Sequence, residues 1–521
     1  MRCDVLLHGG WVVDGTAAPP FRGDVAITGG TIGAIGRLTG MAATERIDVT
    51  GRYVTPGFID THVHADASAG DSQVQEACLR QGVTTVVLGQ DGLSFAPASA
   101  RTIEAVSRYF GPVNGTCPPD LAAGCSVADL LAHYDQRTAL NVGYLAPAGT
   151  IRAEVMGYQS GAADAGQLRA MRALVEDALA DGALGVSAGL EYVPGRFADA
   201  AELAHLCEPV AEAGGVYVSH LRGYEADAWR GMAEMFAIAQ RSGAAVHASH
   251  LHGPANMIAG LLGQAREDGI DVTFDSYPYL RGSTILAMVA LPAEVQAAGP
   301  GDTISRLRDP QVRQRLARDW FPAIEEVLGR ITLSYVGAKQ WQWAEGMTLL
   351  EAARQAGAPP GELVCELVSA SASGAGCVFG QPPTNTPGDI RAHLRHEAQM
   401  VGSDGIYLGA RPHPRGWGSF ARVLGRHTRE LGDLAWGQAI SHLAGHPARR
   451  FSLAGRGLLR PGSVADVVVL DPATVGDNAG YAQPRVHATG VDQVLVSGTF
   501  VLRDRQLTGA RPGRALRRAA R

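Results

Sequence analysis

Hydrophobic positions in the middle of the chain form short apolar runs that alternate with longer amphipathic segments. Short apolar runs bounded by turn residues are typical of buried strands. The runs cover residues 57–60, 83–88, 141–145, 183–187, 216–219, 245–249, 270–275 and 400–402. We therefore expect eight buried strands in this part of the chain.

The segments between these runs have helical periodicity. In residues 167–181, Met171, Val175 and Leu179 recur on one face of the expected helix. Further helices are expected at residues 200–213, 227–241 and 257–267. Strands that alternate with helices favour a (β/α)₈ barrel of the TIM type over an open doubly wound sheet. No G-x-G-x-x-G or P-loop motif follows a strand, which weakens a nucleotide-binding alternative.

The two ends of the chain have a different pattern. Residues 4–35 and 463–504 contain short β-rich segments broken by glycines, which predict hairpins. Neither end makes a good sheet alone. We expect residues 1–56 and 455–521 to pair into one small β-sandwich domain, with the barrel at residues 57–454.

Residues 283–385 are too long for one connection between a strand and a helix. The segment contains helical patterns at 303–319 and 348–356. Long connections at a barrel mouth often carry lids or specificity elements. We therefore expect an excursion that covers the mouth of the barrel.

Composition narrows the class of protein. The 521 residues are 46% hydrophobic and 18% charged with a net charge of -6, typical of a globular protein and not of a nucleic-acid binder. The chain has no long uncharged apolar run and no signal-peptide pattern, so we expect no membrane partner. Its seven cysteines are scattered, which favours reduced thiols in a cytoplasmic protein. The arginine-rich tail, residues 511–521, is expected to be a solvated terminus.

Candidate metal ligands follow the predicted strands. In a barrel of this kind, functional groups gather where the strands end. Histidines or aspartates occupy the ends of the first, second, fifth, sixth and eighth strands: His62, His64, Asp91, His220, His250 and Asp404. His62 and His64 are two residues apart, so both side chains point to the same side of an extended backbone. One strand histidine alone would more often be a core residue, but five strand ends together predict a metal site.

The donor types indicate which metal is expected. Nitrogen and oxygen ligands suit zinc, with manganese, iron, cobalt or nickel as alternatives. Asp404 is the candidate general base and acid, because a carboxylate beside a metal can accept a proton from bound water and pass it to a leaving amine. The alternative role for Asp404 is a helix N-cap after the eighth strand.

Several stretches resemble the D-aminoacylase (N-acyl-D-amino-acid deacylase) family of the amidohydrolase superfamily. They include Val54-Thr-Pro-Gly-Phe-Ile-Asp-Thr-His-Val-His, Gly189-Leu-Glu-Tyr-Val-Pro-Gly and His413-Pro-Arg-Gly-Trp-Gly-Ser-Phe. The resemblance runs through nearly the whole chain. It implies a barrel flanked by a β-sandwich from both termini, one or two zinc ions, and hydrolysis of the amide bond of N-acyl-D-amino acids. The metal would polarise the carbonyl and supply hydroxide, while Asp404 moves the protons.

The chain departs from the family at the expected bridging ligand. The family usually has a cysteine after the second strand, whereas this chain has Asp91 in Gln90-Asp-Gly. Other amidohydrolases use a carboxylated lysine, but the sole lysine here, Lys339, follows no predicted strand. Asp91 is therefore expected to bridge or bind the metal, with an inert turn aspartate as the alternative.

Two further departures concern the substrate. The family commonly has a substrate-binding lysine where this chain has His252, a weaker and pH-dependent cation. A Gly-His motif after the third strand is replaced by Ala146-Pro-Ala-Gly. Tyr192 matches a family residue that helps to hold the substrate carboxylate. Arg222 and Arg152 are also candidate carboxylate partners, although each could instead be a structural salt-bridge arginine.

Two alternative functions remain open on the sequence. A hydrolase of cyclic amides, such as hydantoins or dihydropyrimidines, would use the same scaffold. A barrel without catalytic activity could serve as a binding module, although such proteins usually lack the histidines or the eighth-strand aspartate. We expect a small N-acylated molecule as substrate, and the sequence predicts no oligomeric state.

Overall fold

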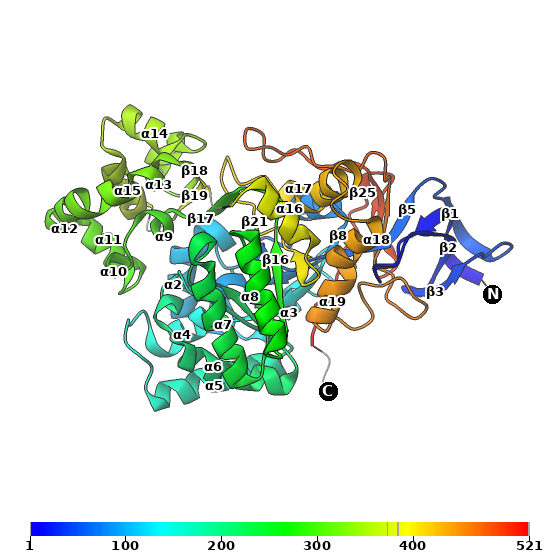
Figure 1. Ribbon diagram of the computed structural model, residues 1–521, viewed down its shortest axis with the longest axis horizontal. Coiled ribbons are helices and arrows are strands. Elements are labelled where there is room, and N and C mark those ends of the chain that lie inside the picture. The colour runs from blue at the N-terminus through cyan, green and yellow to red at the C-terminus, as the bar shows by residue number, and fades with distance from the viewer. Residues whose placement is uncertain (1, 372–373, 383–384, 519–521) are drawn as a thin grey trace.

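The computed structural model describes residues 2–371, 374–382 and 385–518, and Figure 1 shows three parts along its longest axis. A sheet of strands from both chain ends lies at one end. Parallel strands and their helices fill the centre, and residues 281–380, here called the inserted segment, lie at the opposite end. Within the predicted excursion and tail, residues 372–373, 383–384 and 519–521 lie outside the described residues.

The two chain ends share one sheet, which has nine strands within the described residues. The strands are β1 Arg2–Val12, β2 Phe21–Thr28, β3 Thr31–Gly36, β4 Ala42–Asp48, β5 Tyr53–Pro56, β22 Val467–Leu470, β23 Val491–Val496, β24 Thr499–Arg503 and β25 Gln506–Leu507. Strand β5 joins the two halves, because it pairs in parallel with β1 and antiparallel with β22. Val5 and Val25 from one end and Val467 and Leu495 from the other belong to one buried apolar cluster.

Each predicted apolar run forms a parallel strand, with ends within two residues of the prediction. The strands are β6 Phe58–Asp60, β8 Val83–Leu88, β11 Asn141–Tyr144, β13 Gly185–Gly189, β14 Val216–His220, β15 Ala245–Ala248, β16 Val272–Ser276 and β20 Gln399–Val401. Three short strands, β7 Val63–His64, β12 Ala146–Pro147 and β21 Gly405–Ile406, follow β6, β11 and β20.

These parallel strands pair in the order of the chain. One sheet contains β6, β8 and β11, and another runs from β12 through β13, β14, β15 and β16 to β20. The last strand also returns to the first: β21 pairs in parallel with β7, and the Asp404 amide donates to the His62 carbonyl at 2.7 Å.

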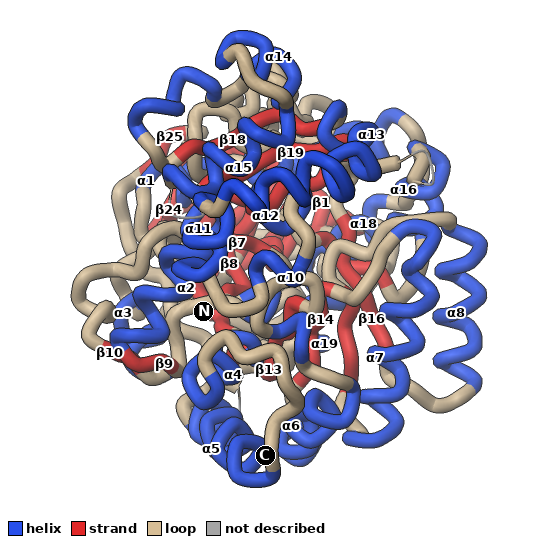
Figure 2. The backbone as a smooth tube through the Cα atoms, turned by 90° about the vertical axis from the view of Figure 1, so that its left-hand side faces the viewer, coloured by secondary structure: helices blue, strands red, loops and turns tan. Residues whose placement is uncertain are grey.

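Amphipathic helices cover these strands, as Figure 2 shows when viewed from the inserted segment. The predicted helices are α5 Ala165–Ala180, α6 Ala200–Ala213, α7 Ala228–Ser242 and α8 Ala255–Glu267. Helix α5 begins at a capping box of Asp164 and Gln167 and buries Met171, Val175 and Leu179, the face expected from the sequence. Other helices are α1 Ser72–Leu79, α2 Ala100–Asn114, α3 Val127–Tyr134, α4 Ala148–Met156, α16 Pro387–Arg395, α17 Arg415–Arg422, α18 Trp436–Ile440 and α19 His446–Arg450.

The inserted segment has its own sheet, and it shares an apolar cluster with helix α2. Its described strands pair antiparallel in the order β17 Arg281–Ile285, β19 Ala375–Gly380, β18 Ile331–Val336. Its helices are α9 Leu286–Ala290, α10 Ala293–Gln296, α11 Pro300–Arg308, α12 Pro310–Arg315, α13 Glu325–Gly329, α14 Leu349–Ala356 and α15 Pro360–Ala370. The sequence predicted α14 but none of these strands.

The helical pattern predicted at residues 303–319 is confirmed, but it forms two helices, α11 and α12, with a break between them. Asp309 is extended, with φ -75° and ψ 119°, and separates α11 from α12. Pro310 explains the break, because a proline disfavours helical geometry at the preceding residue. Asp309 then caps α12 by accepting from the Gln311 amide.

The described part of the tail is only partly solvated, because Arg511, Arg514 and Arg517 are exposed whereas Gly513 and Leu516 are buried. Ala515 pairs with Val142 of β11, and the Leu516 amide donates to the Val142 carbonyl at 2.7 Å. Arg517 and Arg518 donate to backbone carbonyls near the ends of α5 and α6. All seven cysteines are buried and none forms a disulfide. No described helix is long and apolar enough to cross a membrane.

Candidate metal centre and pocket

Unusual backbone conformations place the candidate ligands. Asp91 lies in a tight turn after β8, and His250 and Asp404 lie just after β15 and β20. Their φ angles are 56°, 35° and 50°, in the left-handed region that residues other than glycine rarely adopt. Such conformations persist where surrounding structure enforces them, commonly at functional sites.

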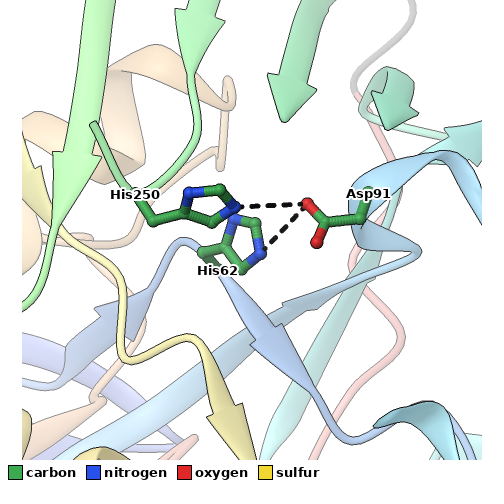
Figure 3. Close-up of side chains that lie close together, drawn as sticks. All are labelled: His62, Asp91 and His250. Atoms are coloured by element: carbon green, nitrogen blue, oxygen red, sulfur yellow. Dashed lines mark ion pairs between the residues drawn. The ribbon is translucent and has the colours of Figure 1, made fainter. Parts of the chain in front are cut away.

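The Asp91 carboxylate lies at the centre of four histidines. Its Oδ1 atom is 3.5 Å from Nε2 of His62 and 3.6 Å from Nε2 of His250, as Figure 3 shows. Its Oδ2 atom is 3.5 Å from Nε2 of His64 and 3.6 Å from Nδ1 of His220. One carboxylate oxygen therefore faces each pair of histidines.

Asp404 lies beside this cluster. Its Oδ1 is 3.3 Å from His64 Nε2 and 3.8 Å from His62 Nε2, and its Oδ2 is 2.7 Å from Nη1 of Arg415. Burial alone would raise the pKa of Asp404, but the charge of Arg415 and the nearby histidines lower it to about 2. The carboxylate is therefore ionised at neutral pH.

Two histidines are oriented from behind. Nδ1 of His64 is 2.9 Å from Oδ1 of Asn114, and Nε2 of His220 is 3.0 Å from Oε2 of Glu191. The amide nitrogen of Asn114 donates to the Leu93 carbonyl, which fixes which of its atoms faces His64. Because these oxygens can only accept a hydrogen bond, each ring carries a proton on the nitrogen that faces them, Nδ1 of His64 and Nε2 of His220. The nitrogens that face Asp91 are therefore the ones available to bind a metal ion.

The cluster lacks partners that a cation would supply. Within the described chain, both ring nitrogens of His62 and Oδ1 of Asp91 are buried without a hydrogen bond. Although burial opposes ionisation, His62 and His220 hold the pKa of Asp91 well below its usual range. Buried polar atoms without partners are costly. The nitrogen and carboxylate donors therefore fit a divalent metal ion such as zinc.

A cavity of about 350 Å³ opens above the cluster. Asp91, His220, His250 and Asp404 contribute to its lining. The inserted segment contributes another part of the lining: Gly282, Ser283, Thr284, Met288, Val289, Val327, Arg330, Phe379 and Gly380. The cavity therefore lies between the strand ends and the inserted segment.

Two predicted substrate-binding residues line this cavity. The Tyr192 hydroxyl is 2.7 Å from Oγ1 of Thr284. The His252 ring stacks on Tyr224, and its Nδ1 donates to the His250 carbonyl at 2.8 Å. Burial lowers the pKa of His252 to about 3, so this ring is uncharged at neutral pH rather than the cation expected from the sequence.

The structure does not bring Arg152 and Arg222 to the cavity. Arg152 is buried, pairs with Glu202 at 3.0 Å and donates to two backbone carbonyls. Arg222 pairs with Glu234 at 3.1 Å and donates to three carbonyls. Both arginines are engaged in the structural contacts that the sequence left open as their alternative.

The sequence prediction missed residues that support the cluster. Glu191 and Arg415 lie inside the Gly189 and His413 stretches quoted above, so those motifs could have identified them. Asp275 accepts from the His250 amide at 2.7 Å and lies 3.7 Å from Nδ1 of His62. Asn114 ends α2, and no sequence feature marks it as a partner of His64.

Comparisons with known proteins all point to the same family. Residues 45–502 match the amidohydrolase family. An N-acyl-D-glutamate deacylase of Alcaligenes xylosoxydans xylosoxydans is 36% identical over 534 residues, covering 100% of this chain and 97% of the relative. A D-aminoacylase of the same organism is 34% identical over 535 residues, covering 99% and 98%.

A solved structure extends this similarity to three dimensions. It is an N-acyl-D-glutamate deacylase from Bordetella bronchiseptica in complex with zinc and a phosphonate inhibitor. It has a TM-score of 0.84 and 32% identity, and the alignment covers 99% of this chain and 100% of that chain. These full-length relatives favour deacylation over the opening of cyclic amides.

Proposed function

The chain belongs to the amidohydrolase family, and we propose that it hydrolyses the amide bond of N-acyl-D-amino acids with zinc as its metal. The observation that carries this proposal is the Asp91 carboxylate, which faces two pairs of histidines beside Asp404. The names of the full-length relatives support the class of substrate and its D configuration.

The metal ligands in this proposal are His62, His64, Asp91, His220 and His250. A bound zinc ion would polarise the amide carbonyl and increase the acidity of water. Asp91 replaces the cysteine that the family resemblance implies, and its two oxygens face different histidines. This arrangement supports Asp91 as a ligand shared by two neighbouring ion positions.

Asp404 is the proposed general base and acid. Its ionised carboxylate can accept the proton of the attacking water and return it to the nitrogen of the leaving amine. Arg415 holds the other carboxylate oxygen and so fixes the orientation of Asp404. Tyr192, from the wall of the cavity, is positioned to bind the substrate.

We also propose that the chain forms a closed barrel with a small domain built from both chain ends. The chain-order pairing of the parallel strands and the return of β21 to β7 support a closed (β/α)₈ barrel over residues 57–454. The shared terminal sheet supports a small β-sandwich domain from residues 1–56 and 455–521, and the inserted segment supports an excursion at about 283–385. Unpaired cysteines support a cytoplasmic location.

The test is amine release from paired N-acyl-D- and N-acyl-L-amino acids by the zinc-loaded enzyme. We expect turnover of the D series and little of the L series. If the enzyme hydrolysed hydantoins or dihydropyrimidines but neither series of N-acyl amino acids, deacylation would be refuted. The protein would then be a metal-dependent hydrolase of cyclic amides. An N-acetyl-D-glutamate and N-acetyl-D-methionine pair covers charged and neutral side chains.

A further inference from the structure

One wall of the cavity does not suit a substrate carboxylate. Glu191, Tyr224, Glu225 and His252, here called the histidine wall, lie where the resemblance implies a carboxylate-binding lysine. The His252 ring is held by the His250 carbonyl and by Tyr224, and its Nε2 is 3.7 Å from Oε1 of Glu225. This wall carries two carboxylates, and its histidine ring already has partners. It therefore offers no cation to a substrate carboxylate.

Two arginines line the cavity within the described chain, Arg330 and Arg415. Arg415 is already neutralised, because its Nη1 contacts Asp404 at 2.7 Å. Its Nη2 donates to the Ser283 carbonyl at 3.1 Å, and its guanidinium lies 4.7 Å from the centre of the Tyr277 ring. Arg330 differs from Arg415 because its acidic partner is exposed rather than buried.

Arg330 has little compensation for its charge. Its ion-pair partner is Glu326, 3.8 Å from Nη2, and that glutamate side chain is 81% exposed. An exposed pair at this distance contributes little. The Nε atom of Arg330 is buried and has no hydrogen-bond partner among the described residues. A bound carboxylate would satisfy this donor.

Apolar side chains of the inserted segment line the same cavity as Arg330. Met288, Val289, Val327 and Phe379 line the cavity with it. The Phe379 ring lies across Gly282, where a Cβ atom would come within 2.4 Å of the ring. An aliphatic stem that ends in a carboxylate matches this wall.

We propose that Arg330 binds a carboxylate of the substrate and makes the inserted segment the specificity-determining wall of the cavity. The inference rests on the proposed deacylation, since it assigns the recognition of that substrate. An N-acyl-D-amino acid with an acidic side chain offers two such groups, the α-carboxylate and the side-chain carboxylate. Both groups could form the same ion pair with Arg330, and the experiment below distinguishes the α-carboxylate from the side-chain carboxylate.

The experiment compares three ligands that differ by one carboxylate: N-acetyl-D-glutamate, N-acetyl-D-glutamine and the α-amide of N-acetyl-D-glutamate. Binding is measured by calorimetry to the zinc-loaded full-length chain with Asp404 present, using analogues in which a methylene group replaces the acetylated amide nitrogen, so that no ligand is consumed and Arg415 stays paired with Asp404. Arg330→Gln removes the charge and Arg330→Lys keeps it. Arg354→Gln, at an exposed arginine of α14, is the matched control. Turnover of the three N-acetyl compounds themselves is measured in parallel.

We expect Arg330→Gln to weaken binding of the N-acetyl-D-glutamate analogue by about 10- to 100-fold, as expected for a lost charged hydrogen bond. Arg330→Lys should recover part of this loss, and Arg354→Gln should change it by less than about twofold. If the side-chain carboxylate is bound, the glutamine derivative is insensitive to Arg330→Gln and the α-amide is sensitive. If the α-carboxylate is bound, the two sensitivities exchange.

The inference would be overturned if Arg330→Gln changed the binding of all three ligands equally, or by less than about threefold. It would also be overturned if none of the ligands bound to the protein with Arg330 unchanged. A ligand-specific loss of binding without any turnover by the enzyme would refute the proposed deacylation alone. The binding and turnover measurements therefore fail independently.

Discussion

At the scale of residues, the centre depends on backbone geometry as much as on ligand type. The positive φ angles of Asp91, His250 and Asp404 direct three side chains into one small volume. Asn114 and Glu191 then hold the far nitrogens of His64 and His220. The sequence identified the candidate ligands because each follows a strand, but it could not predict Asn114, whose position depends on how α2 packs.

Asp404→Asn tests the proton transfer at this scale. Asparagine keeps the shape and can still accept from Arg415, but it cannot take a proton from water. We expect kcat to fall by about 10²- to 10⁴-fold, with zinc content unchanged.

The readouts are steady-state turnover and metal analysis of the purified variant. Asp227→Asn, at an exposed aspartate, is the control and should leave both quantities unchanged. Near-normal turnover of Asp404→Asn would remove Asp404 from its catalytic role.

At the scale of elements, the inserted segment is a unit that the sequence predicts only in part. Its helix α14 has a local signal, a capping box of Thr348 and Glu351. Its sheet has none, because β17 and its partner β19 lie far apart in the sequence. Pairing between distant short strands depends on tertiary contacts, whereas caps and helical periodicity are local.

Two leucines of the inserted segment, one buried and one exposed, test how much its apolar cluster contributes to stability. Leu367 is fully buried in the apolar cluster of the inserted segment, whereas Leu350 is 41% exposed. We expect Leu367→Ala to lower the free energy of unfolding by about 2 to 5 kcal/mol, because it leaves a cavity. Leu350→Ala, the control, should change it by less than about 0.5 kcal/mol.

Urea unfolding measures both variants, and limited proteolysis shows whether cleavage begins within residues 281–380. Equal stability of the two variants would mean that this apolar cluster does not hold the inserted segment together.

At the scale of the whole molecule, one cluster of candidate metal ligands joins strands from across the chain. His64 lies in β7 and His220 in β14, and Asp404 lies between β20 and β21. The sequence predicted this convergence, because parallel strands that follow chain order end on the same face. It did not predict how Leu516 and Arg518 of the tail pack on the strands and helices, since a short basic segment carries no pairing signal.

Metal removal should therefore lower the stability of the entire chain. A ligand that binds only the folded state stabilises it by about 2.7 to 4.1 kcal/mol when its free concentration is 100 to 1,000 times its Kd. We expect a chelator to lower the unfolding temperature and added zinc to restore it, as measured by thermal scans. Asp91→Ala should make the scans insensitive to zinc, and identical scans of metal-loaded and metal-free enzyme would contradict a shared metal centre.

The terminal sheet also sets an order of events during synthesis. Arg52 and Asp492 form an ion pair at 2.7 Å although 440 residues separate them in the chain. One edge of β5 consequently stays without its neighbour β22 until almost all of the chain has left the ribosome. Unpaired strand edges invite association with other chains. This sheet is therefore completed after the barrel strands are made, and nascent chains that stall before β22 keep this edge of β5 open to association with other chains.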